Sequence, residues 1–153
     1  MGVRLIQKTF DPQAEVAAFA EGREDAGALV TFVGSCRART GDVAVAELRI
    51  DHYPGFTEKE IARLAAETAA RFDCPDILVV HRVGAIRPGE AIVLVAALSV
   101  HRANAFKAVE SLMDYLKTDA PLWKKESGPQ GARWIEPRAE DHARRAKADE
   151  GLR

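Results

Sequence analysis

Five basic side chains gather in the last third of the sequence, and their spacing points to an anion. His101 and Arg102 open a segment with helical periodicity, Lys117 closes it, and Lys124 and Lys125 follow a loop that contains a proline. Like charges repel when they are held close together, so a cluster of cations is costly unless an anion lies among them. The pattern therefore predicts a site for a phosphate, a carboxylate or both.

Lys117 and Lys124 are the residues of this cluster best suited to chemistry. A lysine in the last turn of a helix commonly stabilises the helix dipole, and on its own Lys117 would fit that role. Here it follows Leu116, and the run Ala120–Trp123 supplies an apolar wall that leads to Lys124. A lysine held against apolar surface beside another cation has a lowered pKa, so it can act as acid, base or nucleophile.

Three other side chains are candidates for holding the anion. His101 and Arg102 stand where a strand gives way to a helix, and two interpretations stay open: an exposed polar pair, or an anion site that also uses the free N–H groups of the helix start. Arg37 follows the turn Gly34–Cys36, where backbone N–H groups and a guanidinium can converge on a phosphate. Cys36 itself, with no base assigned to it, is better explained as a small packing residue than as a nucleophile.

Several classes of protein are disfavoured by the composition. A formal net charge of −1 lacks the footprint of a general nucleic-acid binder. Cys36 and Cys74 form neither a zinc spacing nor a disulfide framework, and His52 and His81 lack a metal-ligand pattern, so we expect no metal. The first residues lack the apolar run of a signal peptide and no segment is long enough to span a bilayer. We therefore expect a cytoplasmic protein with free thiols.

Periodicity places the first half of the chain on four elements. Asp11–Pro12 has the cap and first-turn residues of a helix that we expect to end at Gly22. The β-branched and aromatic run Ala28–Val33 predicts a strand, and residues 43–50 a second one with a bulge near Ala46–Glu47. A Thr-x-x-Glu capping box then predicts a further helix. Its cap and apolar face are Thr57, Glu60, Ile61, Leu64, Ala65, Thr68 and Phe72.

The second half supplies a hairpin and the helix that carries the basic cluster. Asp76–Val83 and Ala91–Val100 are apolar, β-branched runs joined by Arg87–Glu90, whose Pro-Gly centre suits a type II turn. A third helix is expected over Asn104–Lys117. With 153 residues we expect one α+β domain over residues 1–138, with an antiparallel or mixed sheet, followed by a charged tail over 139–153. Helix and frayed tail both remain open for that tail.

Several strings in this chain resemble the catalytic, or large, subunit of molybdopterin synthase, the MoaE family. They occur in family order from about Gly27 to Glu136, which leaves only the first helix and the tail outside. The strings are GALVTFVGSCR (27–37), LRIDHYPGFTEKEI (48–61), VVHRVGAIRPGEAIVLVAALSVHRANAF (79–106), MDYLKTDAPLWKKE (113–126) and GARWIE (131–136). Asp51 and Phe56 depart from the family's glutamate and methionine, and both changes conserve charge or apolarity.

The resemblance implies a fold, an assembly and a reaction. The fold is the α/β-hammerhead type, and the assembly is a homodimer of large subunits joined by two small ubiquitin-like subunits into a heterotetramer. The small subunit ends in Gly-Gly with a thiocarboxylate that enters a pocket of the large subunit. Two sulfurs then pass to cyclic pyranopterin monophosphate, giving molybdopterin for molybdenum cofactor biosynthesis, with no cofactor or metal in the large subunit.

The resemblance also implies roles for individual residues. Lys117 and Lys124 match the catalytic lysines, and we expect Lys117 to be the main acid/base group, with its pKa lowered by Lys124. The substrate pocket would be formed by Lys117, Lys124, Arg37, His101, Arg102, Lys125 and Glu126, with Phe32 and Met113 as its apolar lining. Arg138 lies where the family supplies an arginine from the neighbouring subunit.

Two alternatives belong to other classes of function. A non-catalytic adaptor could use the same basic pocket to bind a ubiquitin-like protein or a phosphometabolite, and its binding would be indifferent to loss of Lys117. An RNA- or nucleotide-binding domain is disfavoured by the near-zero net charge and by the lack of paired exposed aromatics on one strand. Trp123 and Trp134 are expected to be wall or interface residues.

Overall fold

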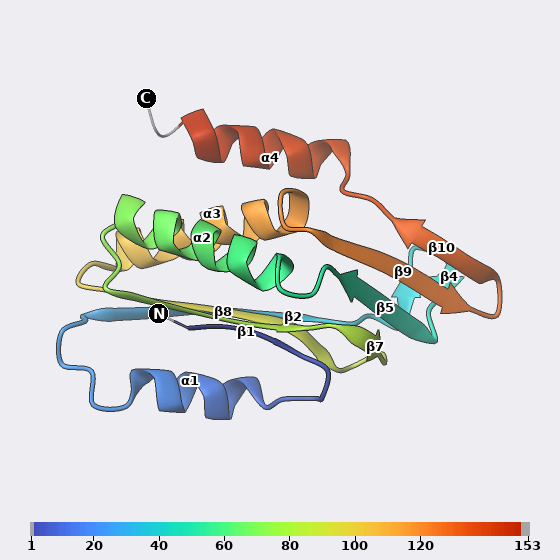
Figure 1. Ribbon diagram of the computed structural model, residues 1–153, viewed down its shortest axis with the longest axis horizontal. Helices are drawn as coiled ribbons and strands as arrows, with labels where there is room; N and C mark the ends of the chain where they lie inside the picture. Colours follow the sequence, from blue (N-terminus) through green and yellow to red (C-terminus); the bar gives the residue numbers. More distant parts are fainter. Residues whose placement is uncertain (1, 151–153) are drawn as a thin grey trace.

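The computed structural model describes residues 2–150, which form two four-stranded sheets, a two-stranded ribbon and four helices (Figure 1). This architecture confirms the α+β class. The helices are α1 (Pro12–Ala20), α2 (Thr57–Arg71), α3 (Arg102–Thr118) and α4 (Ala139–Glu150). The strands are β1 (Gly2–Ile6), β2 (Ala28–Ser35), β3 (Arg39–Thr40), β4 (Val43–Ala44), β5 (Glu47–His52), β6 (Asp76–Arg82), β7 (Gly84–Ile86), β8 (Ala91–Ser99), β9 (Leu122–Gly128) and β10 (Gly131–Ile135).

The first sheet has the strand order β1-β6-β8-β2 and is mixed. β6 and β8 pair antiparallel, as the sequence predicts, and β2 pairs antiparallel with β8. The turn before β8 is also as predicted, since Gly89 has φ +88° and the Glu90 N–H donates to the Arg87 carbonyl at 3.1 Å. The sequence did not predict β1, which pairs parallel with β6. It also did not predict β7, a short strand in the connection between β6 and β8 that pairs with β5 of the second sheet.

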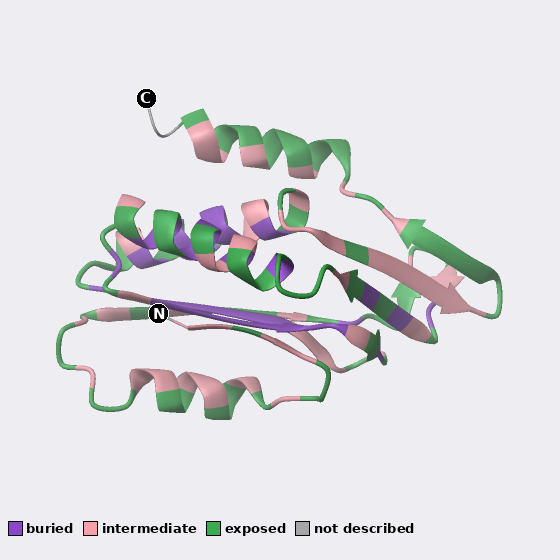
Figure 2. Ribbon diagram, viewed as in Figure 1, coloured by how far each residue is buried: buried purple, intermediate pink, exposed green. Residues whose placement is uncertain are grey.

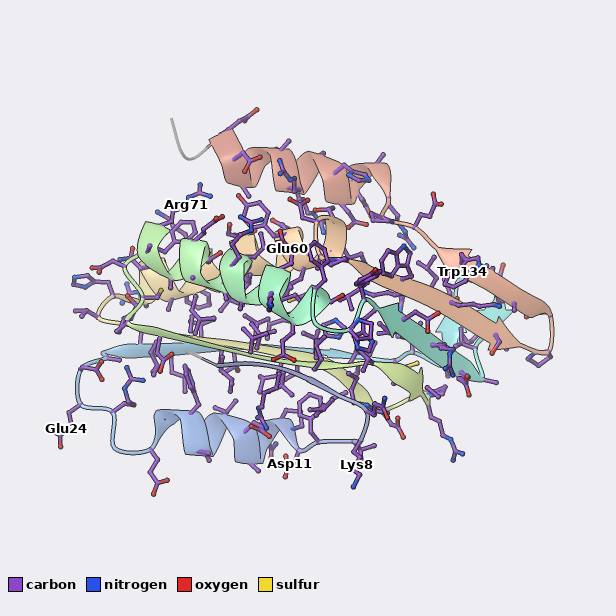
Figure 3. The ribbon with its side chains drawn as sticks, viewed as in Figure 1. Lys8, Asp11, Glu24, Glu60, Arg71 and Trp134 are labelled. Carbon is purple, nitrogen blue, oxygen red and sulfur yellow. The ribbon has the colours of Figure 1, made fainter. Side chains whose placement is uncertain are left out.

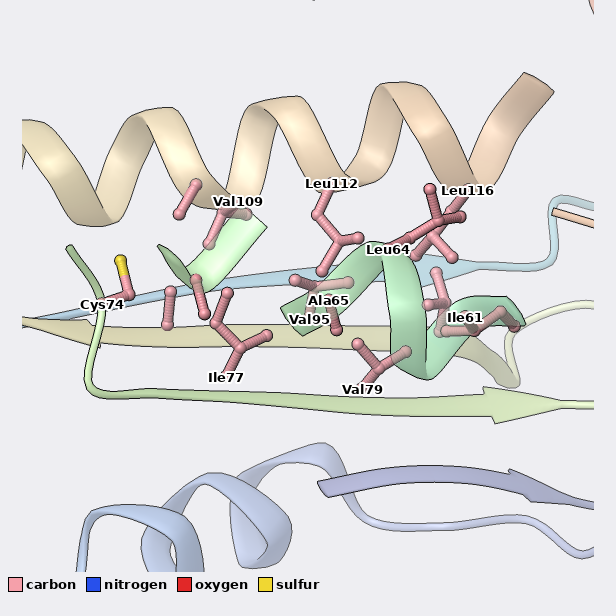
Figure 4. Close-up of a cluster of buried hydrophobic side chains, with 14 residues drawn as sticks. Ile61, Leu64, Ala65, Cys74, Ile77, Val79, Val95, Val109, Leu112 and Leu116 are labelled. Atoms are coloured by element: carbon pink, nitrogen blue, oxygen red, sulfur yellow. The ribbon is translucent and has the colours of Figure 1, made fainter. Parts of the chain in front are cut away.

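Helices cover both faces of the first sheet (Figure 1). α1 lies on one face, over Leu78, Val80 and Leu94, while α2 and α3 lie on the other. Figure 4 shows the larger core, where Leu64 of α2 and Leu112 of α3 meet the strands. Burial is concentrated on the central strands and the inner sides of α2 and α3, and neither α1 nor α4 contains a fully buried residue (Figure 2). The predicted apolar face of α2 is confirmed, since Ile61, Leu64, Ala65 and Thr68 are buried and Phe72, just past the helix end, packs partly buried against the same core.

The second sheet has the order β10-β9-β5-β7 and carries much of the basic cluster. On β9, Lys124 is paired with Ile50 and Glu126 with Leu48, and both β5 residues are buried. Paired residues of antiparallel strands project to the same face, so Lys124 and Glu126 leave β9 on the core side. The sequence analysis left Leu122–Ile135 without strands because charged residues on both faces of β9 hide the alternation that identifies a strand.

The helix starts differ in how well they were predicted. Asp11 caps α1 as expected, with its carboxylate accepting from the Gln13 N–H at 2.9 Å. The capping box at α2 is wrong: Phe56 is the cap residue and makes no side-chain cap bond. Thr57 is instead fully buried, where its hydroxyl accepts from the Tyr53 N–H at 2.8 Å and donates to the Pro121 carbonyl at 3.0 Å. The Thr57 hydroxyl therefore connects the loop before α2 to the loop between α3 and β9.

Most of the charged tail is a helix that packs on α3. The Tyr115 hydroxyl donates to Asp149 at 2.7 Å, and the Arg145 guanidinium pairs with Asp119 at 2.9 Å while lying over the Tyr115 ring. These contacts decide between the two alternatives in favour of an ordered helix for residues 139–150. Residues 151–153 of the predicted tail lie outside the described part of the chain.

Candidate active site

Two hollows meet at Lys117 and Lys124. The first, called here the aromatic hollow, has a volume of about 500 Å³ and lies between the end of α3 and the β9–β10 hairpin. Trp134, labelled in Figure 3, stands on β10 beside it. Its walls are formed by Leu116, Lys117, Thr118, Asp119, Ala120, Pro121, Leu122, Trp123, Lys124, Trp134, Ile135, Glu136 and Pro137. Trp123 and Trp134 are about half exposed, as expected of wall residues.

The second hollow, called the arginine hollow, has a volume of about 400 Å³ and shares both lysines with the first. It is lined by Ser35, Cys36, Arg37, Thr40, Leu48, Ile92, Lys117, Lys124, Glu126, Ile135, Glu136, Arg138, Glu140, Asp141 and Arg144. Three guanidinium groups, from Arg37, Arg138 and Arg144, therefore face the same space as the lysines. The lysine pair forms the boundary between a hollow with two tryptophans in its wall and a hollow lined by five cationic groups and four carboxylates.

The two lysines have different surroundings. Lys117 is exposed at the end of α3, whereas Lys124 is partly buried on the core side of β9. Burial and then the nearby charge of Lys117 lower the pKa of Lys124 to about 8, with Asp141 opposing the shift. An ammonium with this pKa exchanges its proton near neutral pH. The sequence predicts a lowered pKa for Lys117 through the charge of Lys124, whereas in the structure the lowered pKa is that of Lys124.

A buried hydroxyl fixes the loop that separates the lysines. The loop Asp119–Pro121 connects α3 to β9, and the Pro121 carbonyl accepts from the fully buried Thr57 hydroxyl at 3.0 Å. Because Lys117 and Lys124 stand on either side of this loop, its conformation sets their separation. Thr57 is thus a positioning residue for the two lysines. The sequence pattern predicts only a helix cap at Thr57 and does not indicate this role.

Glu126 is held from two sides within the arginine hollow. Its carboxylate accepts from the Thr40 hydroxyl at 2.7 Å and pairs with the Arg133 guanidinium at 3.0 Å. The strand ribbon that carries Thr40 passes close to β9, since a side chain at Gly128 would meet the Ala44 carbonyl at 2.3 Å. Glu126 therefore links the ribbon to the hairpin and lies beside the lysines, as predicted.

The remaining predicted site residues are not in either hollow. His101 and Arg102 are exposed at the start of α3, and the rise of ~1.5 Å per helical residue places them about 23 Å from Lys117 along the helix axis. Met113 packs partly buried at the edge of the main core, and Phe32 is 41% exposed on β2. Lys125 points away from Lys124, with its ammonium 5.4 Å from the Trp134 ring centroid. Within one chain, the basic cluster is split between the two ends of α3.

The sequence analysis missed the contribution of α4 to the site. Glu140, Asp141 and Arg144 line the arginine hollow, although the segment was regarded as a tail. Its helical spacing of charges was visible, but no sequence signal showed which element it would pack on. Cys36 also lines this hollow; burial raises the pKa of its thiol, which disfavours the thiolate and agrees with the prediction that it is no nucleophile.

The described residues contain neither a metal-binding cluster nor a membrane-spanning helix. Between residues 2 and 150, no three His, Cys, Asp or Glu side chains are grouped as they would be to hold a metal ion. Over the same residues, no helix combines the length and apolarity needed to cross a membrane.

The chain matches known proteins over most of its length. A family model described as MoaE protein matches residues 5–119. The molybdopterin synthase catalytic subunit of Caulobacter vibrioides is 51% identical over 141 residues, covering 92% of this chain and 93% of that protein. These matches confirm the resemblance found in the sequence.

Solved structures show the same fold. The molybdopterin biosynthesis MoaE protein from Burkholderia ambifaria superposes with a TM-score of 0.79 at 44% identity and covers 100% of both chains. A complex of subunits 1 and 2 of molybdopterin-converting factor from Helicobacter pylori gives a TM-score of 0.71 at 20% identity, over 88% of this chain and 90% of that one. The second likeness is one of fold.

Proposed function

Because this chain belongs to the MoaE protein family, whose relatives are named molybdopterin synthase catalytic subunits, we propose that it transfers sulfur to a pyranopterin phosphate from the C-terminal thiocarboxylate of a small partner subunit. The observation that carries this proposal is the meeting of two hollows at one lysine pair. A transfer reaction between a protein tail and a small molecule needs two approaches to one reacting centre.

The two hollows suit two different reactants. The aromatic hollow is walled by Trp123, Trp134 and Pro121, which offer apolar surface to an extended peptide tail. The arginine hollow offers Arg37, Arg138 and Arg144, and guanidinium groups bind phosphate oxygens with paired hydrogen bonds. We assign the partner's tail to the first hollow and the phosphate-bearing substrate to the second. The thiocarboxylate would then lie between Lys117 and Lys124.

Each lysine has a separate task in this arrangement. The thiocarboxylate sulfur bonds to the pterin, and water then adds to the carbonyl carbon, so that the C–S bond breaks and the partner's tail leaves as a carboxylate. The addition of water builds negative charge on the carbonyl oxygen, and a fixed cation nearby stabilises that charge. Lys117, exposed at the end of α3, supplies the cation. Lys124, with its pKa of about 8, can release and take up the protons that the pterin ring exchanges.

His101 and Arg102 take part only if a second copy of the chain contributes them. Both are exposed, and α3 separates them from Lys117 of their own chain by its full length. We propose that they reach the arginine hollow of a partner copy, where they would add to the phosphate contacts. Multi-subunit assembly is supported by the subunit names of the relatives and by the Helicobacter pylori neighbour, which was solved as a complex of two subunits.

A sulfur-transfer assay tests the proposal. The chain is mixed with thiocarboxylated small subunit and cyclic pyranopterin monophosphate, and the dithiolene product is measured as its fluorescent oxidised derivative. We expect Lys117→Ala and Lys124→Ala each to reduce the rate by at least about a hundredfold. Lys8→Ala, which removes an exposed lysine that precedes α1 and lines neither hollow, is the matched control and should keep full activity.

The alternative outcomes are also informative. Full activity in Lys117→Ala would refute the assignment of that residue. A stable complex with the small subunit but no product, in a wild-type chain with verified substrate, would instead favour the adaptor function. In that case binding should be unaffected by Lys117→Ala.

A further inference from the structure

A third cleft lies among α2, α3 and α4, away from the lysine pair. It has a volume of about 310 Å³, roughly that of ten water molecules at their liquid density. Its lining residues are Arg71, Phe72, Lys107, Glu110, Ser111, Asp114, Arg144, Lys147 and Ala148. Figure 3 labels Arg71 at the end of α2, on the side of that helix nearer to α4. We call this space the helix cleft.

Two polar atoms at the floor of the helix cleft have no hydrogen-bond partner among residues 2–150. Ser111 is only 6% exposed, and its hydroxyl bonds neither to a side chain nor to the preceding turn of α3. One terminal nitrogen of Arg71, Nη1, is likewise buried and unpaired, while the guanidinium carbon lies 4.7 Å from the centroid of the Phe72 ring. Buried polar groups are nearly always satisfied, so two orphans in one cleft point to a ligand with oxygen acceptors.

The rim of the cleft has a surplus of positive charge. Four cationic groups, from Arg71, Lys107, Arg144 and Lys147, face two carboxylates, from Glu110 and Asp114. Two positive charges are therefore in excess. None of the four cations forms an ion pair within the described residues, unlike the neighbouring Arg145, which pairs with Asp119. Donors that are close together and unpaired match a ligand that brings its own negative charge.

We propose that the helix cleft binds a phosphate group, either as the free anion or as the phosphate of a small monoester. A phosphate carries close to two negative charges near neutral pH and offers oxygens to both orphaned donors. Ser111 and Arg71 hold it at the floor, and the lysines approach it from the rim. Because Arg144 lines both this cleft and the arginine hollow, α4 is shared between the two spaces. The cleft is distinct from the hollows of the proposed sulfur transfer and does not depend on that function.

Residue-resolved NMR during a phosphate titration tests the site. Inorganic phosphate is added to the ¹⁵N-labelled wild-type chain, and the amides of Phe72 and Ser111 report the helix cleft, while those of Arg37 and Lys124 report the arginine hollow. We expect saturable shifts at Phe72 and Ser111 in the millimolar range or tighter. Arg71→Gln should weaken this binding about tenfold or more, because it removes a charge-assisted hydrogen bond.

Further variants guard against loss of folding and against a simple charge effect. Ser111→Ala keeps every charge and favours a helix, so it should fold and should still weaken binding by about threefold to tenfold. Lys147→Gln should weaken binding, whereas Lys59→Gln, which removes the same charge elsewhere, should not. Glycerol 3-phosphate in a parallel titration separates the two sources: tighter binding than phosphate indicates a monoester, and equal binding indicates the free anion.

Two results would overturn the proposal. One is the absence of saturable shifts at Phe72 and Ser111 in the folded wild-type chain. The other is equal affinity at these amides in the wild type, Arg71→Gln and Ser111→Ala. The amides of Arg37 and Lys124 report the arginine hollow separately. Shifts confined to them would refute phosphate binding in the helix cleft and would not affect the proposed binding of substrate in the arginine hollow.

Discussion

Lys124 owes its unusual chemistry to the strand position it occupies. Its neighbour Lys125 points the opposite way, over the Trp134 ring, whereas Lys124 projects to the face that carries buried Ile50 and Leu48. Alternation along one strand thus gives adjacent lysines different environments. The sequence Trp-Lys-Lys-Glu contains both lysines but does not indicate which of them faces the core. That distinction required the register of β9 with β5.

The first prediction concerns the coupling of the two lysines. In Lys117→Ala, the pKa of Lys124 should rise from about 8 toward its usual 10.5 without reaching it, because burial is the larger cause of the shift and remains. NMR titration of ¹³C-labelled lysine side chains measures this directly. Lys125→Ala is the control, since Lys125 lies on the other side of the strand and should leave the pKa unchanged. An unaltered pKa in Lys117→Ala would show that the two charges do not interact.

The second prediction concerns stability and pH. Lys124 has a folded-state pKa of about 8 and an unfolded value near 10.5, so between these values the unfolded chain binds more protons and stability rises with pH. Below pH 8, Lys124 is charged in both the folded and the unfolded chain, so the full free-energy cost of burying its ammonium lowers the stability of the fold. Lys124→Met should therefore be more stable than the wild type at pH 7 by about 1–3 kcal/mol, which allows for partial solvent access.

Urea denaturation across pH measures this difference. The advantage of Lys124→Met should shrink as the pH rises from about 8 to 10.5. Lys59→Met, at an exposed position of α2, serves as the control and should show no such trend. A constant difference between Lys124→Met and the wild type over this range would contradict the shifted pKa.

At the scale of elements, the loop between α3 and β9 governs the site. It is short, Asp119–Pro121, and two different elements fix it: Thr57 of α2 binds the Pro121 carbonyl, and Arg145 of α4 binds the Asp119 carboxylate. α3 and β9 are consecutive elements in different layers of the molecule, and this loop connects the end that carries Lys117 to the strand that carries Lys124. Its conformation is therefore a condition of the chemistry.

The third prediction tests the role of Thr57. Thr57→Val keeps the shape of the side chain but leaves the Pro121 carbonyl and the Tyr53 N–H without a partner. We expect a loss of about 1–3 kcal/mol in the free energy of unfolding, and a fall in sulfur-transfer rate in the fraction that stays folded. Denaturation and the sulfur-transfer assay measure the two effects.

Thr68→Val separates the loss of stability from the loss of activity. Thr68 is also buried on α2, but its hydroxyl donates to the Leu64 carbonyl within the same helix. This variant should keep the activity of its folded fraction. Equal activity per folded molecule in Thr57→Val and Thr68→Val would exclude a positioning role for Thr57.

The sequence predicted elements well where one face is apolar and poorly where polarity is mixed. α2, α3, β6 and β8 have clear apolar periodicity, and all four were predicted with small errors at their ends. β9 has charged residues on both faces, and β10 has a charged residue on one face and an aromatic residue on the other, so neither was predicted. The capping box at Thr57 failed because burial against another loop outweighed the helix cap. Local patterns contain no information about such long-range partners.

At the scale of the whole molecule, residues that are close in the string need not share a site. His101 and Arg102 were grouped with Lys117 because one helix connects them, yet that helix also keeps them apart. Apolar side chains are exposed along the edge strand β2 and around the start of α3: Leu29, Phe32, Val33, Val100 and Phe106. Exposed apolar surface beside an edge strand is typical of an interface. Under the proposed function, a second copy would supply the contacts of His101 and Arg102.

The fourth prediction asks which chain supplies Arg102. Lys117→Ala and Arg102→Ala should each be inactive alone. If Arg102 acts in the site of a partner copy, a mixed dimer of the two variants contains one site with both substitutions and one with neither. Random reassortment after mild unfolding and refolding should then restore about a quarter of the wild-type activity, because half of the dimers are mixed. If Arg102 acted within its own chain, every site would keep one substitution and mixing would restore nothing. Refolding each variant by itself is the control, and recovery there would invalidate the comparison.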